Sequence, residues 1–406
     1  MTEFKVIDLS YDGLCRYAIN NTFRRCNSFE MTYKNNIIAD KFGMFLDEVK
    51  PDIVHIQHLL FLSTTIIQEA KKRGIPVLFT LHDYWLICHQ GQLLKRDFTI
   101  CNNHSDSDCI KCLYYQLSIK RGVMGIYQTL QQSSFRFLIQ PLKKIYSRYA
   151  RNTFLSGSKA IKQIEKRNEH IKEICRAVDM FTAPSQFLKK RFRVFGIPGE
   201  KIIFSPYGLN SGAFRDFNKK DSNKLRFVYM GTLLPAKGID VLIKAFNRMK
   251  DEGVELKIYG KLSIYKGFEY YIKYIRNLAR NKNIKFMGEY DNKDVSKIFS
   301  EVDVLVVPSI WYENSPLVIQ EAQLAGIPVI ASRIGGIAEL IQDGENGLLF
   351  QPKDVVGLYE KLKALIKRPG LIEHLRSNIN PPKGIETNAG EIEDIYEDLI
   401  SRNKSH

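Results

Sequence analysis

The chain has 406 residues, of which 44% are apolar and 26% charged, a composition that excludes a disordered or membrane-spanning protein, and its length suffices for two domains. No run of about 18 apolar residues predicts a membrane-spanning helix, and the first residues do not resemble a secretory signal, so we expect a cytoplasmic protein. The net charge of +16 favours an anionic partner.

Short apolar strands alternate with helical patterns along the chain. In chain order, the predicted strands cover 52–57, 77–81, 226–231, 256–260, 284–288, 303–308, 329–332 and 347–350. Two of them follow the tripeptide Gly-Ile-Pro, in which Gly74 and Gly326 end a helix in the left-handed conformation and the proline prevents its continuation. Because the strands lack polar alternation, we expect parallel sheets covered on both faces. The pattern predicts an α/β fold with two Rossmann-like domains facing across a cleft.

The polar stretch 210–224 is the predicted linker between these domains. It divides the chain into an N-terminal domain, 1–209, and a C-terminal domain, 210–375. A last helical segment, 376–406, is expected to pack back on the N-terminal domain. The N-terminal domain carries a cysteine-rich and basic helical insertion at about 86–176.

Four cysteines lie close together in a polar part of this insertion. They are Cys88, Cys101, Cys109 and Cys112, with the spacing C-x12-C-x7-C-x2-C. Seven cysteines in a long cytosolic chain do not suggest a disulfide framework, so the cluster predicts a structural zinc site that pins a loop. His89 and His104 are close enough in sequence to replace one ligand. The alternative is four thiols that share no partner.

Most of the positive charge falls in the segment from Leu113 to Arg176, which holds thirteen Lys or Arg against three Glu. Its mixture of aromatic, aliphatic and basic residues predicts amphipathic helices. One interpretation is attachment to an anionic membrane surface, at the inner face of the membrane. The other is a solvated basic face. No nucleic-acid-binding motif accompanies the charge, so nucleic acid is not an expected partner.

Farther along, the stretch "WYENSPLVIQEA" places Glu313 and Glu321 on either side of a helix start. Ser315 is the expected N-cap and Pro316 the expected first helical residue. The N–H groups of Ser315, Leu317 and Val318 would then point into the crevice where α/β sheets bind nucleotides, which makes these residues candidates for nucleotide binding. Glu321 shares a helix face with apolar residues and needs donors such as ribose hydroxyls. The alternative is an ordinary solvated glutamate.

Two glycine-containing loops belong to the same edge of the predicted sheet. Gly231 and then Lys237 follow the first strand of the C-terminal domain, where a lysine would clamp a diphosphate. Gly335 and Gly336 follow a later strand and would let the backbone approach a ligand. The alternatives are a surface lysine and an ordinary tight turn.

Taken together and in order, these motifs resemble the donor half of a family 4 glycosyltransferase. The stretches that carry the resemblance are "GTLLPAKG", "ENSPLVIQEA", "GIPVIAS", "GGIAELI" and "DGENGLLF". The resemblance implies the GT-B fold and retaining transfer of a sugar from a nucleotide diphosphate sugar of UDP or GDP type, without a catalytic metal. We expect a glycan or lipid-linked acceptor and a role in polysaccharide synthesis.

The resemblance also implies roles for single residues. Glu313 would contact hydroxyls of the donor sugar, and Glu321 would bind the ribose. Lys237 would neutralise the diphosphate as it leaves. His82 matches the histidine that faces the donor sugar from the other domain, although on its own it would be interpreted as a structural residue. No residue is assigned as a nucleophile.

The chain departs from the family pattern at two points. Thr232 stands where the family commonly has an arginine of the phosphate clamp, and the first strands and glycine-rich loop are not apparent, since Gly13 is the one glycine before Tyr33. The N-terminal domain is therefore expected to be shortened, and activity could be impaired. A second hypothesis follows, in which the protein is a non-catalytic relative that binds a nucleotide or glycan and acts as a scaffold.

Overall fold

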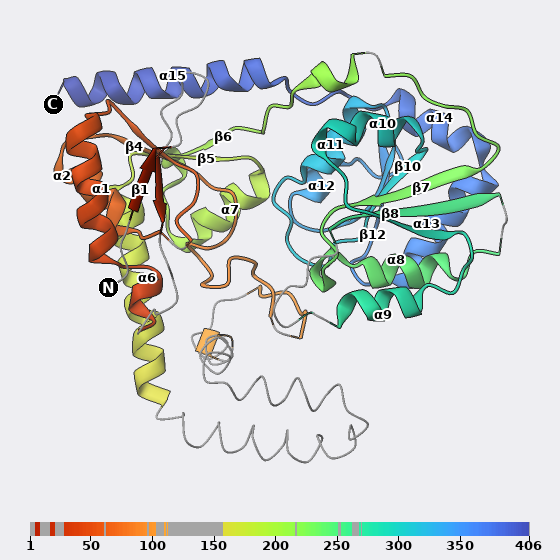
Figure 1. Ribbon diagram of the computed structural model, residues 1–406, viewed down its shortest axis with the longest axis horizontal. Coiled ribbons are helices and arrows are strands. Elements are labelled where there is room, and N and C mark those ends of the chain that lie inside the picture. Colours follow the sequence, from red (N-terminus) through yellow and green to blue (C-terminus); the bar gives the residue numbers. More distant parts are fainter. Residues whose placement is uncertain are drawn as a thin grey trace.

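The computed structural model contains two parallel α/β sheets, one in each half of the chain (Figure 1). It describes residues 5–8, 17–20, 28–60, 62–95, 97–102, 109–110, 112, 157–215, 217–250, 253–261, 268 and 270–405. Most of the basic segment therefore lies outside the described residues. Among the helices described, none is long and apolar enough to cross a membrane.

The N-terminal sheet has four parallel strands in the order β3-β4-β5-β6. They are β3 (Val54–Ile56), β4 (Val77–Thr80), β5 (Met180–Ala183) and β6 (Ile202–Phe204). The accompanying helices are α1 (Asn36–Val49), α2 (Thr65–Lys72), α6 (Gly157–Ala177) and α7 (Gln186–Phe195). Two further strands, β1 (Lys5–Asp8) and β2 (Tyr17–Asn20), pair with each other and are antiparallel.

The C-terminal sheet has six parallel strands in the order β12-β11-β10-β7-β8-β9. They are β7 (Leu225–Met230), β8 (Val254–Tyr259), β9 (Ile284–Gly288), β10 (Val304–Val307), β11 (Val329–Ser332) and β12 (Gly347–Phe350). The strand order reverses between β7 and β10, which is the position where doubly wound sheets open a crevice at the carboxyl ends of their strands.

Helices cover both faces of this sheet, and alternate residues of each strand pack against opposite layers. One layer contains α8 (Ile239–Phe246), α9 (Tyr271–Leu278), α13 (Val355–Lys367) and α14 (Pro369–Ser377). The other contains α10 (Val295–Ser300), α11 (Leu317–Leu324) and α12 (Ile337–Leu340). The sequence prediction of strands covered on both faces is confirmed, and β4, β10, β11 and β12 are buried throughout.

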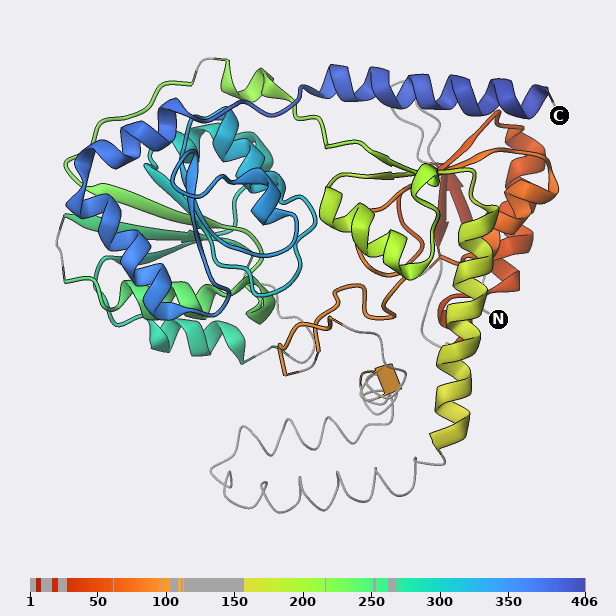
Figure 2. The ribbon, with the colours of Figure 1, turned by 180° about the vertical axis from the view of Figure 1, so that it is seen from behind.

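The chain crosses between the two domains twice, and the crossings run side by side. Leu209, before the short helix η4 (Ser211–Phe214), pairs with the segment that leads into α15 (Ile385–Lys404). Its N–H donates to the carbonyl of Lys383 at 2.9 Å, and its carbonyl accepts from Ile385 N at 3.0 Å. The helix α15 then extends along the N-terminal domain, as Figure 2 shows from behind. There Tyr396 lies with its hydroxyl 2.6 Å from His55 Nδ1.

Candidate active site

The site residues predicted from the C-terminal motifs meet where the strand order reverses. Lys237 ends the short helix η5 (Pro235–Lys237) after β7, and Glu313 lies in the loop after β10. The loop that carries Lys237 closes on the end of β10, because Gly238 has a φ of +69° and a Cβ there would lie 1.9 Å from the carbonyl oxygen of Pro308. The two βα loops at this edge are therefore held against each other.

Glu313 is buried, with 6% of its surface exposed, and one of its carboxylate oxygens receives three hydrogen bonds. Lys237 Nζ donates to Oε1 at 2.6 Å. Ser309 Oγ and Trp311 Nε1 donate to the same oxygen at 2.7 Å and 2.8 Å. The Lys237 ammonium also lies 5.3 Å from the centroid of the Trp311 ring. A buried carboxylate needs such donors and an opposite charge, and here one lysine supplies the charge.

Gly335 and Gly336 shape the loop around Glu313. A Cβ at Gly335, where φ is +56°, would lie 2.6 Å from the Glu313 carbonyl oxygen, and one at Gly336 would lie 1.6 Å from that of Asn314. The N–H of Gly336 donates to the Glu313 carbonyl at 2.8 Å. The backbone that approaches these glycines closely, on the side where a Cβ would stand, is therefore the loop 313–314.

The start of α11 differs from the sequence prediction. Pro316 occupies the N-cap position and the helix begins at Leu317, with no side-chain cap. The predicted cap, Ser315, instead accepts a hydrogen bond from Gln320 Nε2 at 3.0 Å. The prediction of Ser315 as N-cap is wrong because this side chain finds a partner farther into the helix. Val318 and the half-exposed Leu317 follow in the first turn.

Glu321 lies one turn inside α11 and is partly buried. Burial raises the pKa of its carboxyl above the ordinary value. Among the described residues it makes neither a hydrogen bond nor an ion pair with another side chain, in contrast to Glu313. Burial raises the pKa of Tyr290, in the loop after β9, and the charge of Glu321 raises it further. Glu321 is thus a partly buried carboxylate that has no hydrogen-bond donor among the described side chains.

His82 follows β4 at the carboxyl edge of the N-terminal sheet. Its Nε2 lies 2.6 Å from Gln57 Oε1, and its Nδ1 lies 2.6 Å from the hydroxyl of Tyr207. Burial is the main reason why the pKa of His82 is lowered, and the nearby His58 lowers it further. The same edge bears a small cavity lined by Gln57, His58, His82 and Asp83.

Asn314 joins the donor-side loop to the edge that carries His82. Its Nδ2 donates to the carbonyls of Leu81 and His82, each at 3.3 Å, and its Oδ1 accepts from Ser185 Oγ at 2.7 Å. The neighbouring Tyr312 packs on Phe187, with 4.8 Å between ring centroids. The domains therefore contact each other through the loop that contains Glu313.

Glu339 makes a second contact between the domains. Its carboxylate accepts hydrogen bonds from the backbone N–H groups of Gln186, at 2.8 Å, and of Phe187, at the start of α7. A carboxylate is favoured there by the unpaired N–H groups and the positive end of the helix dipole. The sequence analysis missed Asn314, Glu339, Gln57 and Tyr207. Only Asn314 and Glu339 could have been noticed, because they stand inside the motifs "ENSPLVIQEA" and "GGIAELI".

The zinc prediction is not supported. Cys88, Cys101, Cys109 and Cys112 are each half-buried, and the first three pack against the N-terminal core. In the described part of the chain, no group of three or more His, Cys, Asp or Glu side chains is arranged to hold a metal ion. His104 lies outside the described residues.

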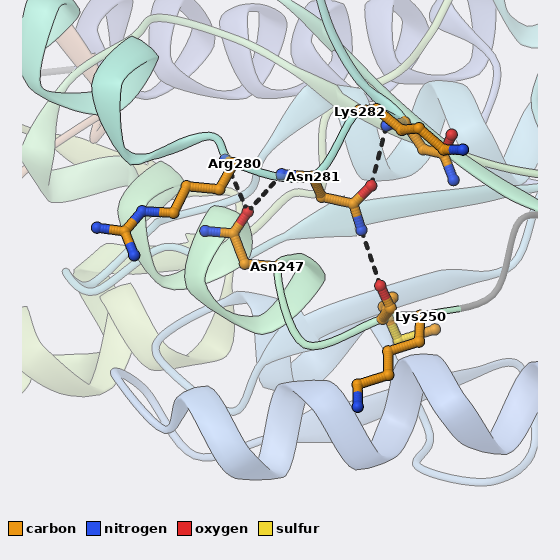
Figure 3. Close-up of a pocket in the computed structure, with 7 residues that line it drawn as sticks. Asn247, Lys250, Arg280, Asn281 and Lys282 are labelled. Atoms are coloured by element: carbon orange, nitrogen blue, oxygen red, sulfur yellow. Dashed lines mark hydrogen bonds between the residues drawn. The ribbon is translucent and has the colours of Figure 1, made fainter.

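A larger cavity, of about 230 Å³, lies away from this site (Figure 3). It is at the amino edge of the C-terminal sheet, where residues 247–250 precede β8 and 280–283 precede β9. Asn247 Oδ1 accepts from the N–H groups of Arg280 and Asn281, and Asn281 Nδ2 donates to the carbonyls of Phe246 and Met249. These amides hold the two loops together, so we do not assign the cavity a part in the site.

Two parallel Rossmann-like sheets, one in each half of the chain, define the GT-B fold, and the C-terminal sheet reverses its strand order between β7 and β10. Residues 210–380 match the family model described as "Glycosyl transferases group 1". The C-terminal half of the chain therefore belongs to the group 1 glycosyltransferases, the family 4 that the sequence motifs resemble.

Relatives agree with this classification. The chain is 33% identical over 162 residues to an uncharacterized glycosyltransferase of Methanocaldococcus jannaschii, a match that covers 40% of this chain and 43% of the relative. It is 27% identical over 196 residues to a putative colanic acid biosynthesis glycosyltransferase of Salmonella typhimurium, covering 47% and 48%. The chain spans about half the length of the curated relatives it matches.

The structure of Anabaena Alr3699/HepE in complex with UDP and glucose has the same fold. The two share 16% sequence identity with a TM-score of 0.60, and the match covers 89% of this chain and 81% of that one. At this level of identity the likeness concerns the fold.

Proposed function

We propose that the protein is a retaining glycosyltransferase that moves a sugar from a nucleotide diphosphate sugar to a glycan or lipid-linked acceptor. The observation that carries the proposal is the arrangement at the reversal of strand order. There Lys237 and the buried Glu313 form an ion pair, and Glu321 keeps its acceptor capacity on the adjoining helix.

The ion pair gives Lys237 and Glu313 linked roles in donor binding. A diphosphate at the crevice carries more negative charge than a carboxylate and would draw the Lys237 ammonium toward itself. Glu313 Oε1 would then lose its charged donor and could accept hydrogen bonds from sugar hydroxyls in its place. Glu321 would bind the ribose. The lysine would stabilise the charge that develops on the leaving diphosphate.

The donor of a solved relative suggests which compound to test first. One crystal structure of Anabaena Alr3699/HepE, with a TM-score of 0.57 to this chain, is a complex with UDP-glucose. The expected donor class is therefore a UDP sugar, and a GDP sugar is the comparison. Thermal-shift measurements against a panel of both classes identify the nucleotide, and the release of free nucleotide then measures turnover.

Two variants test the site itself. We expect Lys237→Met to reduce turnover of the selected donor by at least about a hundredfold, the size typical for a lost electrostatic contact in the transition state. Glu321→Ala should raise KM for the donor about tenfold, because it removes the acceptor for the ribose hydroxyls. The matched controls are Glu345→Ala and Lys293→Met, which change exposed residues of the same domain. Full turnover in both site variants would overturn the assignment. Nucleotide binding without turnover in the unaltered protein would instead support a non-catalytic, scaffolding relative.

The names of relatives support a polysaccharide acceptor. Two are called putative colanic acid biosynthesis glycosyltransferases, and another is described as an uncharacterized protein in the cps region of Klebsiella pneumoniae. A lipid-linked acceptor would be met at a membrane, and the basic segment within 113–176 is the part of the sequence suited to an anionic surface. Co-sedimentation with anionic but not neutral vesicles is the expected result. Equal binding to both would contradict an electrostatic attachment.

A further inference from the structure

The imidazole of His82 is held on both of its nitrogens by side chains from two other segments. The hydroxyl of Tyr207 lies 2.6 Å from Nδ1, and Gln57 Oε1 lies 2.6 Å from Nε2. The rings of His82 and Tyr207 are also stacked, with centroids 5.6 Å apart and planes inclined by 23°.

The surroundings of Gln57 decide which nitrogen of His82 carries the proton. Gln57 Nε2 lies 3.0 Å from His55 Nε2, so the amide oxygen is the atom turned toward His82. An amide oxygen only accepts hydrogen bonds, and His82 Nε2 must therefore be the donor. Nδ1 of the neutral ring is then an acceptor, and the Tyr207 hydroxyl donates to it. The carboxylate of Asp83, next in the chain, is bound by His58 Nε2 at 2.7 Å.

Tyr207 also ties His82 to the connection between the domains. It lies in the first crossing, next to Gly208, whose N–H donates to Asn388 Oδ1 at 3.2 Å. A Cβ at Gly208 would lie 2.5 Å from the carbonyl oxygen of Gly384, so the first crossing is packed tightly against the second. The Tyr207 backbone is thus anchored at the point where both crossings meet α15.

We propose that Gln57 and Tyr207 are positioning residues that hold His82 as the Nε2–H tautomer, with both ring nitrogens occupied. His82 then does not transfer a proton. The His82 ring instead presents a rigid surface to the donor sugar, and Tyr207 sets its orientation from the connection between the domains. The inference rests on the proposed function, because the orientation matters to turnover only if a donor sugar lies against His82.

One experiment measures the tautomer without any substrate. Long-range ¹H–¹⁵N correlation spectra of the histidine rings distinguish the two neutral tautomers, and the His82→Gln variant assigns the His82 signals. We expect the Nε2–H pattern in the unaltered protein, and loss of that single pattern in Tyr207→Phe and Gln57→Met. Tyr359→Phe is the matched control, since it removes a tyrosine hydroxyl from α13, which packs in the core of the C-terminal domain. An Nδ1–H or rapidly exchanging pattern for His82 in the unaltered protein would overturn the proposal.

The second measurement follows kcat and KM with the donor selected in the nucleotide-sugar screen. Loss of one aligning hydrogen bond should lower kcat about fivefold in Tyr207→Phe, with KM for the donor nearly unchanged. Tyr359→Phe should retain the kcat of the unaltered protein. Equal kcat in Tyr207→Phe and the unaltered enzyme would refute the positioning role. If the unaltered protein turns over no donor, the proposed function fails, and the spectra alone decide whether His82 is held as described.

Discussion

The ion pair between Lys237 and Glu313 makes a quantitative prediction. The substitution Lys237→Met keeps the length of the side chain but removes the ammonium that donates to Glu313 Oε1 at 2.6 Å. Glu313, with 6% of its surface exposed, is then left with the neutral donors Ser309 and Trp311. A buried charge without an opposite charge is unfavourable, so the variant should be less stable.

The exposure of the pair sets the size of the effect. Removing one partner of a fully buried ion pair costs about 3–5 kcal/mol. The Lys237 side chain is 28% exposed and two hydrogen bonds to Glu313 remain, so we expect a loss of about 2 kcal/mol. Glu313→Gln alone should cost about 1 kcal/mol, because its amide oxygen can still accept hydrogen bonds. The double variant should also lose only about 1 kcal/mol, a coupling of about 2 kcal/mol between the two residues.

The fluorescence of Trp311 reports this site directly, since its indole N–H donates to the same carboxylate oxygen. The chain has two tryptophans, and a Trp85→Phe background leaves Trp311 as the one reporter. Urea unfolding of the four proteins of the cycle gives the free energies, with Lys293→Met as the control for loss of an exposed lysine. Additive losses, or equal stabilities of Lys237→Met and Lys293→Met, would refute the reasoning.

Three further changes have definite expected outcomes. Gly336→Ala should lower the free energy of unfolding by about 2 kcal/mol, since its Cβ would lie 1.6 Å from the carbonyl oxygen of Asn314. The control is Gly370→Ala, whose Cβ meets open space and which should not lower the free energy of unfolding. Glu339→Gln should weaken the contact with the start of α7 by about 1 kcal/mol and raise the radius of gyration in small-angle scattering, and an unchanged radius would contradict the contact. Burial lowers the pKa of His55 from 6.5 to about 4, so protonation of this ring favours the unfolded chain. The free energy of unfolding should therefore fall as the pH falls from about 6.5 toward 4. Urea unfolding of His55→Gln should show a smaller decrease over the same pH range.

The sequence predicted those parts of the fold that local physical rules determine. All eight predicted strands are present, because short apolar runs bounded by turn residues are typical of buried strands. Gly74 and Gly326 do adopt the left-handed conformation, with φ of +68° and +63°. Lys237 and Glu313 meet because each stands just after a strand, and neighbouring parallel strands end at the same edge of the sheet.

Local rules failed where a side chain has a competing partner. Ser315 has the preferred residue type for an N-cap, yet Gln320 donates to its hydroxyl from within the helix.

The cysteine spacing gave ligands of the right kind but no information about the path of the loop between Cys88 and Cys109. A spacing of this length fixes neither the direction nor the separation of the thiols, and only a tight turn such as C-x2-C does so.

The contacts between the domains were outside the reach of any local pattern. Glu339 is separated by about 150 residues from the helix start that it caps, and Asn314 by more than 230 from the carbonyls that it binds. Both occur in motifs whose neighbouring residues were assigned to the donor. The donor-side loop therefore does two things at once, since Glu313 pairs inside its own domain while the next residue reaches across to the edge that holds His82. A substitution at Asn314 should consequently disturb the orientation of the two domains without removing any of the charged groups of the site.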